Sequence, residues 1–173
     1  MSSPVHRLEA ALARRPADAR LLQQLADLYV RSGYLLKAVA VLRQLTELAP
    51  ERADLPLALA RLHVELELID DAEEWFDVAR ERALRVGDEL VAAEALNAHA
   101  RLRPHDVVVQ LRLVEALLRE DRHDEAATTL NRLRAAHPEL PLSLATVRSA
   151  CHAIRQRDAI EAQLRSMSFA QPN

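Results

Sequence analysis

Seven histidines and one cysteine are the residues of this 173-residue chain that could bind a metal or act as a nucleophile. No two histidines are four residues apart, and a single cysteine cannot form a Cys-x-x-Cys pair, so the spacings typical of metal sites are missing. We expect His63 and His99, which fall on apolar helix faces, to be structural, and Cys151 to be a buried, unreactive thiol. The other histidines are at positions 6, 105, 123, 137 and 152.

The acidic pairs Asp70-Asp71 and Glu73-Glu74 are the remaining groups that could support acid–base catalysis. They fall at an expected helix start, where the helix dipole favours negative charge, so we interpret them as structural. Gly33 and Gly87 are the only glycines, and two isolated glycines cannot form a phosphate-binding loop. We therefore expect no enzyme, no cofactor and no metal.

Composition and charge favour an all-α protein. Half of the residues are apolar but only 3% are aromatic, and two glycines are too few for the tight turns of a sheet protein. The net charge is −3 with acids and bases interspersed, so nucleic acid is a poor default partner. No apolar run approaches the ~18 residues of a membrane span. The N-terminal residues lack a secretory-signal pattern, and we expect a cytoplasmic protein.

The two glycines begin two copies of one pattern. Each is followed by alanine at +5, leucine at +9 and proline at +17. Five prolines, at 16, 50, 104, 138 and 172, are separated by steps of 34, 54, 34 and 34 residues. A period of about 34 is typical of helix–turn–helix repeats.

Apolar residues within each period have helical spacing. Leu22, Leu25, Ala26 and Tyr29 form one stripe, and Ala38, Leu42 and Leu45 form the next. Gly33 is expected to end the first helix in a left-handed conformation, a role that Asp121 takes in a later copy. Small residues at the crossing, Ala26 and Ala38, allow close helix packing. The residues expected as helix N-caps are Asp70, Asp71, Asp88 and Asp106.

We predict an α-solenoid of about four to five helical hairpins, in a single domain over residues 1–173. Residues 1–18 are expected to be a partial repeat, and 141–173 a capping repeat and tail. The predicted helices are near 5–14, 19–32, 35–48, 53–67, 70–86, 88–103, 107–120, 123–136, 142–155 and 158–167. Helix 70–86 can close the second repeat or open a third. We favour an odd helix that disturbs the stacking near 84–90.

The run Leu25-Ala26, Tyr29, Gly33, Ala38, Leu42 and Pro50, repeated in phase, resembles the tetratricopeptide repeat (TPR) family. The resemblance implies that the first helix of each pair lines a concave groove for a peptide or partner helix. Six aliphatic residues of that lining have no core role in this register and are expected to form an exposed stripe; the alternative is an ordinary solvated face. By register the lining is Arg20, Gln23, Asp27, Val30, Arg31, Asp54, Leu57, Arg61, Val64, Glu65, Val108, Leu111, Glu115, Leu118 and Arg119.

The resemblance favours an adaptor or scaffold of the small bacterial type that binds another protein in this groove. A secretion- or assembly-type chaperone holding a hydrophobic client is the alternative, and an RNA-binding helical repeat fits less well because the net charge is negative. Self-association is left open. Trp75 lies on the outer side of its helix, where we expect half-buried packing rather than a contact role.

Overall fold

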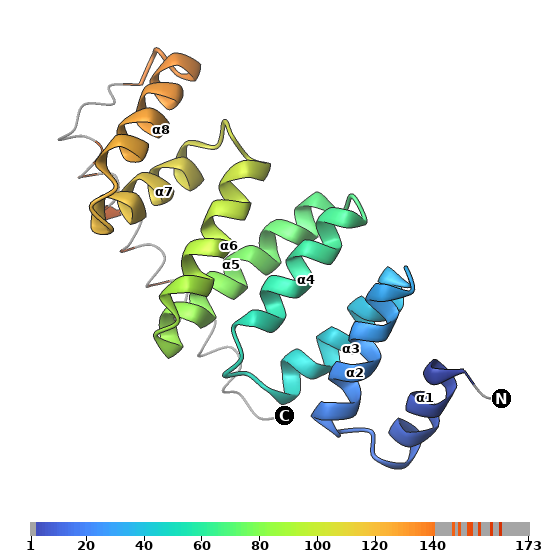
Figure 1. Cartoon of the computed structure of the whole chain (residues 1–173). Coiled ribbons are helices and arrows are strands. Elements are labelled where there is room, and N and C mark those ends of the chain that lie inside the picture. Colours follow the sequence, from blue (N-terminus) through green and yellow to red (C-terminus); the bar gives the residue numbers. More distant parts are fainter. Residues whose placement is uncertain are drawn as a thin grey trace. The chain divides into compact units, whose positions relative to one another are not determined.

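Eight α-helices joined by short turns, with no strand, make up the part of the chain that the computed structural model describes (Figure 1). That part is residues 3–140 and the single positions 147, 149, 152, 153, 156, 160 and 163. The helices are α1 (Pro4–Arg14), α2 (Ala19–Arg31), α3 (Leu35–Leu48), α4 (Asp54–Glu65), α5 (Ile69–Val86), α6 (Glu89–Leu102), α7 (Val107–Arg119) and α8 (His123–Ala136). Each lies close to its predicted range, and the all-α repeat fold is confirmed.

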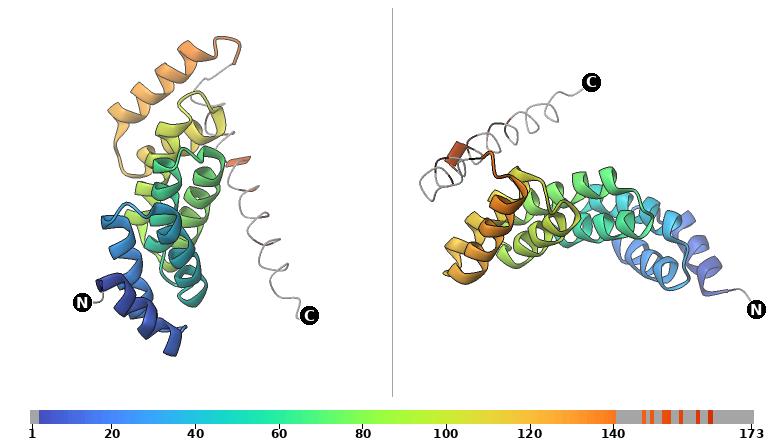
Figure 2. Two further views of the ribbon diagram at one scale, coloured as in Figure 1. Left: turned by 90° about the vertical axis from the view of Figure 1, so that its right-hand side faces the viewer. Right: turned by 90° about the horizontal axis from the view of Figure 1, so that it is seen from above.

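The predicted helices 142–155 and 158–167 lie outside the described residues except at those single positions, and Cys151 lies outside them. The chain divides into two compact units, residues 1–95 and 96–173, and the boundary falls within α6. In the first unit α1 packs on α2, α2 on α3, α3 on α4 and α4 on α5. The connections are short, so successive helices run antiparallel (Figure 2).

Four turns between helices share one backbone geometry. A residue with positive φ stands at Gly33 (73°), Glu67 (59°), Gly87 (77°) and Asp121 (57°). In each turn the next residue's N–H donates to a carbonyl five residues earlier, at 2.9 Å. This bond closes the Schellman motif, which satisfies carbonyls left free at a helix C-terminus. The left-handed role predicted for Gly33 and Asp121 is confirmed, and Glu67 has the same role without a sequence signal.

The spacing of these turns explains the 54-residue step between prolines. Gly33 and Glu67 are 34 residues apart, as are Gly87 and Asp121, but Glu67 and Gly87 are separated by only 20. One helix, α5, therefore has the same turn at both of its ends. It closes the hairpin that starts with α4 and also opens the hairpin that ends with α6. An extra helix is therefore present between Pro50 and Pro104, and the disturbed stacking expected near 84–90 stays a prediction.

The core of the first unit follows the predicted register. Small residues sit at the helix crossing, where Ala26 and Ala38 are both fully buried, and larger aliphatic side chains fill the space around them. Tyr29 is also buried, and its hydroxyl donates to Glu9 Oε1 of α1 at 2.6 Å. The buried cluster is Leu22, Leu25, Ala26, Tyr29, Ala38, Leu42, Leu45, Ala49, Leu55, Leu59 and Leu62.

The core of the second unit lies between α7 and α8. Val114 and Ala126 are the buried pair at the crossing that corresponds to Ala26 and Ala38. Val147 is buried in the same cluster. The other members are Leu111, Leu117, Leu130 and Leu133.

Two of the four predicted N-cap aspartates are confirmed. The Asp88 and Asp106 carboxylates accept from the backbone N–H three residues later, at 3.1 and 3.0 Å. Asp70 and Asp71 are not caps, because α5 begins at Ile69 and the cap position is Leu68. They lie instead in the first turn of α5, where negative charge is favourable.

Candidate binding face

The predicted groove residues fall into three groups, on α2 and α4 in the first unit and on α7 in the second. The expected aliphatic stripe is mostly wrong. Leu57 and Leu111 are each only 4% exposed, whereas Val30 is 40% exposed. Val64, Val108 and Leu118 are half-buried, so Val30 is the most accessible of the six aliphatic residues.

The burial of Leu57 and Leu111 has a structural reason. α4 packs against both α3 and α5, so a helix in this position buries side chains on several faces. Leu111 belongs to the α7–α8 cluster, and Leu118 packs half-buried against it. Val108 is half-buried as well. Leu57, Leu111 and Leu118 thus contribute to the cores, and a register that counts one stripe per helix misses this.

The polar residues on α2 and at the start of α4 are connected by a chain of hydrogen bonds. Gln23 donates from Nε2 to Asp27 Oδ1 at 2.9 Å, and its Oε1 accepts from Arg52 Nη1 at 3.1 Å. The Arg52 guanidinium also donates to both carboxylate oxygens of Asp54, at 3.1 and 2.5 Å. The hydrogen bond to Asp54 raises the pKa of Arg52 above its ordinary value, although burial lowers it. We call these four residues the polar chain.

A second link joins α4 to the first half of α6. Arg61 forms an ion pair with Glu94, and both side chains are about half exposed. Both residues belong to the first unit. α4 thus carries an exposed charge, Arg61, which is paired with Glu94 of α6, while the neighbouring residues of α4 are buried.

The remaining predicted residues are less connected. In the second unit Arg119 donates to Glu115 at 2.8 Å, one helical turn away. Arg20, Arg31 and Glu65 are exposed. The structure therefore links Gln23 directly to Asp27, connects it to Asp54 through Arg52, and pairs Glu115 with Arg119.

Sequence reasoning missed Arg52 and Glu94. Arg52 lies in the α3–α4 connection, outside the helix register from which the groove was derived. Its position two residues before Asp54 was a usable signal, since opposite charges at that spacing can pair around a helix start. Glu94 lies on α6, which the proline pattern marks as a second helix of a hairpin, and its contact with Arg61 spans 33 residues and depends on tertiary packing.

An aromatic stack explains Trp75 and His63. The centres of the His63 and Trp75 rings lie 6.4 Å apart, and the rings are nearly parallel. The Arg43 guanidinium carbon lies 5.6 Å from the centre of a Trp75 ring. His63 Nδ1 lies 2.7 Å from the Leu59 carbonyl, to which it donates. His63 and His99 are buried and Trp75 is half-buried, as predicted. These side chains tie α3, α4 and α5 together.

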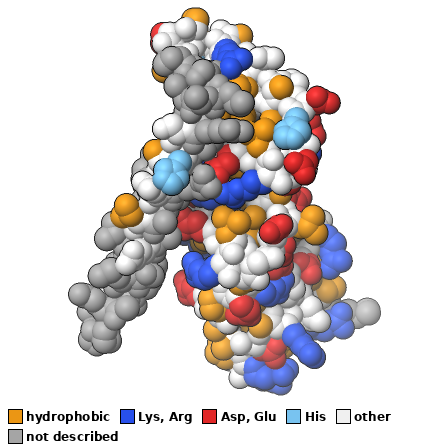
Figure 3. All heavy atoms as spheres, turned by 90° about the vertical axis from the view of Figure 1, so that its left-hand side faces the viewer, with side chains coloured by type: hydrophobic (Ala, Val, Ile, Leu, Met, Phe, Trp, Pro, Cys, Tyr) orange, Lys and Arg blue, Asp and Glu red, His pale blue; other side chains and the backbone are white. Residues whose placement is uncertain are grey.

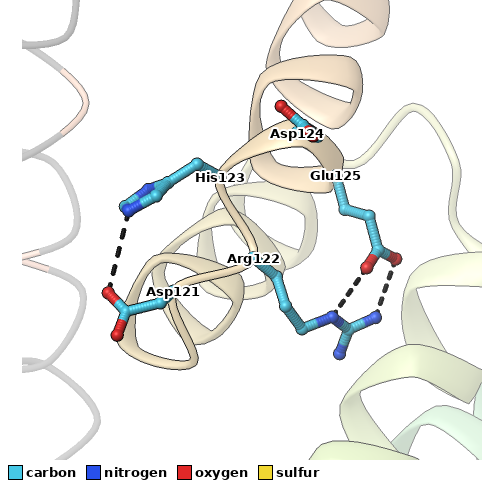
Figure 4. Close-up of a pocket in the computed structure, with 5 residues that line it drawn as sticks. All are labelled: Asp121, Arg122, His123, Asp124 and Glu125. Atoms are coloured by element: carbon cyan, nitrogen blue, oxygen red, sulfur yellow. Dashed lines mark hydrogen bonds and ion pairs between the residues drawn. The ribbon is translucent and has the colours of Figure 1, made fainter.

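An open depression of about 330 Å³ lies at the α7–α8 turn (Figure 4). Its lining residues are Asp121, Arg122, His123, Asp124 and Glu125. Arg122 makes two 2.7 Å hydrogen bonds with Glu125 and another of 2.8 Å with Glu120. These bonds lower the pKa of Glu125 below its ordinary value. Arg122 is thus paired with Glu125 inside the depression, and none of the lining residues is apolar.

The described residues contain no group of three His, Cys, Asp or Glu side chains arranged to hold a metal ion. Among the same residues, no helix is both long and apolar enough to cross a bilayer. Figure 3 shows one face of the molecule, on which acidic and basic side chains are interspersed and hydrophobic side chains form small separate areas.

Two family models for the tetratricopeptide repeat match the chain, at residues 19–52 and 83–147. No curated protein matches in sequence. Among solved structures, MamA is 15% identical with a TM-score of 0.42, covering 78% of this chain and 87% of that one. YrrB, described as a TPR protein with an unusual peptide-binding site, is 16% identical with a TM-score of 0.39, covering 88% and 84%. BtubC from P. vanneervenii is 22% identical with a TM-score of 0.49, covering 90% and 66%.

The two family matches together cover more than half of the chain, and the first coincides with the repeat copy read from the glycine and proline spacing. Repeats of this class are generally interaction modules without catalytic activity. The chain belongs to the tetratricopeptide repeat family and is a protein–protein interaction module.

Proposed function

We propose that the chain is an adaptor that binds a segment of another protein across the exposed face of α2 and α4. The observation that carries the proposal is the polar chain, because it fixes side chains from α2 and from the α3–α4 connection in one arrangement. Groups that are ordered before binding lose less conformational entropy when a partner arrives.

The chemistry of this face favours a polar, extended partner segment. Asp27 and Asp54 are exposed and keep lone pairs that a partner's N–H groups can reach. Arg31 and Arg61 offer donors nearer the other end of the two helices. Val30, 40% exposed, supplies one apolar contact. We infer recognition by hydrogen bonds and charge, with a smaller apolar part than the register implied.

This composition favours the adaptor over the two alternatives. A chaperone for hydrophobic clients needs accessible apolar surface, and Leu57 and Leu111 are buried. An RNA-binding face needs clustered positive charge, whereas Asp27, Asp54 and Glu94 place carboxylates on this side.

The proposal is tested by affinity capture from cells that express the chain naturally, followed by a titration with the purified partner. The test variant is Gln23→Ala/Arg61→Glu, which breaks the polar chain and reverses the exposed charge of α4. The matched control is Gln44→Ala/Arg85→Glu, with the same substitutions at exposed positions of α3 and α5. We expect the test variant to lose the partner and the control to retain it. Equal retention by both folded variants would refute binding at this face.

A further inference from the structure

The first unit presents two neighbouring turns of opposite charge. Between Asp27 and Glu47 the chain has Arg31, Lys37 and Arg43 but no acidic residue. Between Arg61 and Arg80 it has seven acidic residues and neither lysine nor arginine. The α2–α3 turn is therefore basic and the α4–α5 turn is acidic.

Both turns lie at the same end of the first unit. Because α2, α3, α4 and α5 run alternately up and down and pack in order, the chain returns to this end with each hairpin. Figure 1 shows the α2–α3 and α4–α5 turns at the upper ends of their hairpins. Gly33 and Glu67 take corresponding positions in the two turns.

Each turn also exposes apolar side chains. On the basic turn Tyr34 is 54% exposed and Leu36 is 69% exposed, and on the acidic turn Leu68 is 43% exposed. Scattered exposed aliphatics need no explanation, but here they stand beside charges of one sign on each turn.

Four of the charged side chains on these turns form no ion pair within the described residues. The Lys37 ammonium lies 5.5 Å from the ring centres of Tyr29 and Tyr34 and forms no ion pair. Arg31 on the basic turn, and Glu67 and Asp71 on the acidic turn, form none either within residues 3–140.

We propose that these two turns form a self-complementary surface through which two copies of the chain associate. In a two-fold arrangement, the basic turn of one copy faces the acidic turn of the other, and the same contact occurs twice. A second copy supplies acidic and apolar groups to one turn and basic and apolar groups to the other. Two turns form a small interface, so the association is weak and depends on concentration.

The full chain is tested by sedimentation velocity, from about 1 μM to about 500 μM, a range that resolves a weak dimer. The basic-turn variant is Arg31→Glu/Lys37→Glu, and the acidic-turn variant is Glu67→Lys/Asp71→Lys. Each should weaken self-association at least ~10-fold, because like charges then face each other. An equimolar mixture of the two variants should associate again, since the two glutamates introduced on one variant then face the two lysines introduced on the other, and the second turn-to-turn contact keeps its native residues.

Arg101→Glu/Arg132→Glu, at exposed positions of the second unit, is the matched control and should associate like the wild type. Circular dichroism establishes that each variant is folded. If a variant does not fold, the wild-type association is measured at low and high salt instead, and it should weaken as salt screens the charges. A wild type that stays monomeric would overturn the proposal. So would dimers that persist in both variants, a mixture that fails to associate, or an association that salt does not change.

Discussion

Replacement of Glu67 by glycine is expected to stabilise the protein, although it removes a side chain. Glu67 has φ 59°, a left-handed conformation that costs an ordinary residue roughly 1–2 kcal/mol. Glycine avoids this cost but loses about 0.5–1 kcal/mol more backbone entropy on folding. The difference predicts that Glu67→Gly raises the free energy of unfolding by roughly 0.5–1 kcal/mol.

Gly33 and Gly87 give the matched reverse substitution. A Cβ added at either glycine would meet no atom within 4 Å, so Gly→Ala changes backbone strain without a steric clash. Gly33→Ala should therefore lower the free energy of unfolding by roughly the same 0.5–1 kcal/mol. Glu67→Ala keeps the left-handed strain and removes the carboxylate, and it separates the backbone effect from the loss of charge.

Urea unfolding followed by Trp75 fluorescence is the suitable assay. Trp75 is the only tryptophan and lies in α5, directly after the Glu67 turn. Midpoints should shift up for Glu67→Gly and down for Gly33→Ala with unchanged slopes. If Glu67→Gly is no more stable than Glu67→Ala, the strain argument for this turn is wrong.

Three further predictions concern the cores. Burial, with help from the Glu9 hydrogen bond, raises the pKa of Tyr29 to about 12. The neutral Tyr29 hydroxyl therefore contributes to the free energy of unfolding below pH 10, and this contribution of roughly 2–3 kcal/mol is lost as the pH rises through 12. Tyr29→Phe should remove this part of the alkaline loss of stability in unfolding curves. Thr46 has a buried hydroxyl without a hydrogen-bond partner, so Thr46→Val should raise the free energy of unfolding by about 1 kcal/mol, seen as a higher urea midpoint; a lower midpoint would indicate a bond that forms in solution. Leu57→Asp and Leu111→Asp each bury an unpaired charge and should lower stability by about 3 kcal/mol or more, and variants with native circular dichroism and midpoints would contradict their core roles.

The helices and turns could be predicted because local chemistry determines them. Alanines at the crossings, the two glycines and the prolines each restrict the backbone or the packing distance in a way that sequence spacing reveals. Glu67 could not be predicted, because glutamate has no preference for a left-handed turn and takes this conformation only because the packed hairpin imposes it.

The binding face was less predictable than the fold. The buried state of Leu57 depends on how many helices surround α4, which one helical stripe does not reveal. The contacts of Arg52 with Gln23 and of Glu94 with Arg61 span 29 and 33 residues and depend on tertiary packing. A periodic pattern identifies which helix faces repeat, but it does not identify side chains that come from connections or from an extra helix.

The most direct test of the proposed binding face is the dissociation constant of the captured partner segment, measured by calorimetry. The two double variants described for the capture experiment, with changes on α2–α4 and on α3–α5, are compared with the wild type. We predict at least ~10-fold weaker binding for Gln23→Ala/Arg61→Glu, about 1.4 kcal/mol, and wild-type affinity for Gln44→Ala/Arg85→Glu. The reverse order, with the α3–α5 variant impaired and the α2–α4 variant binding normally, would contradict the account.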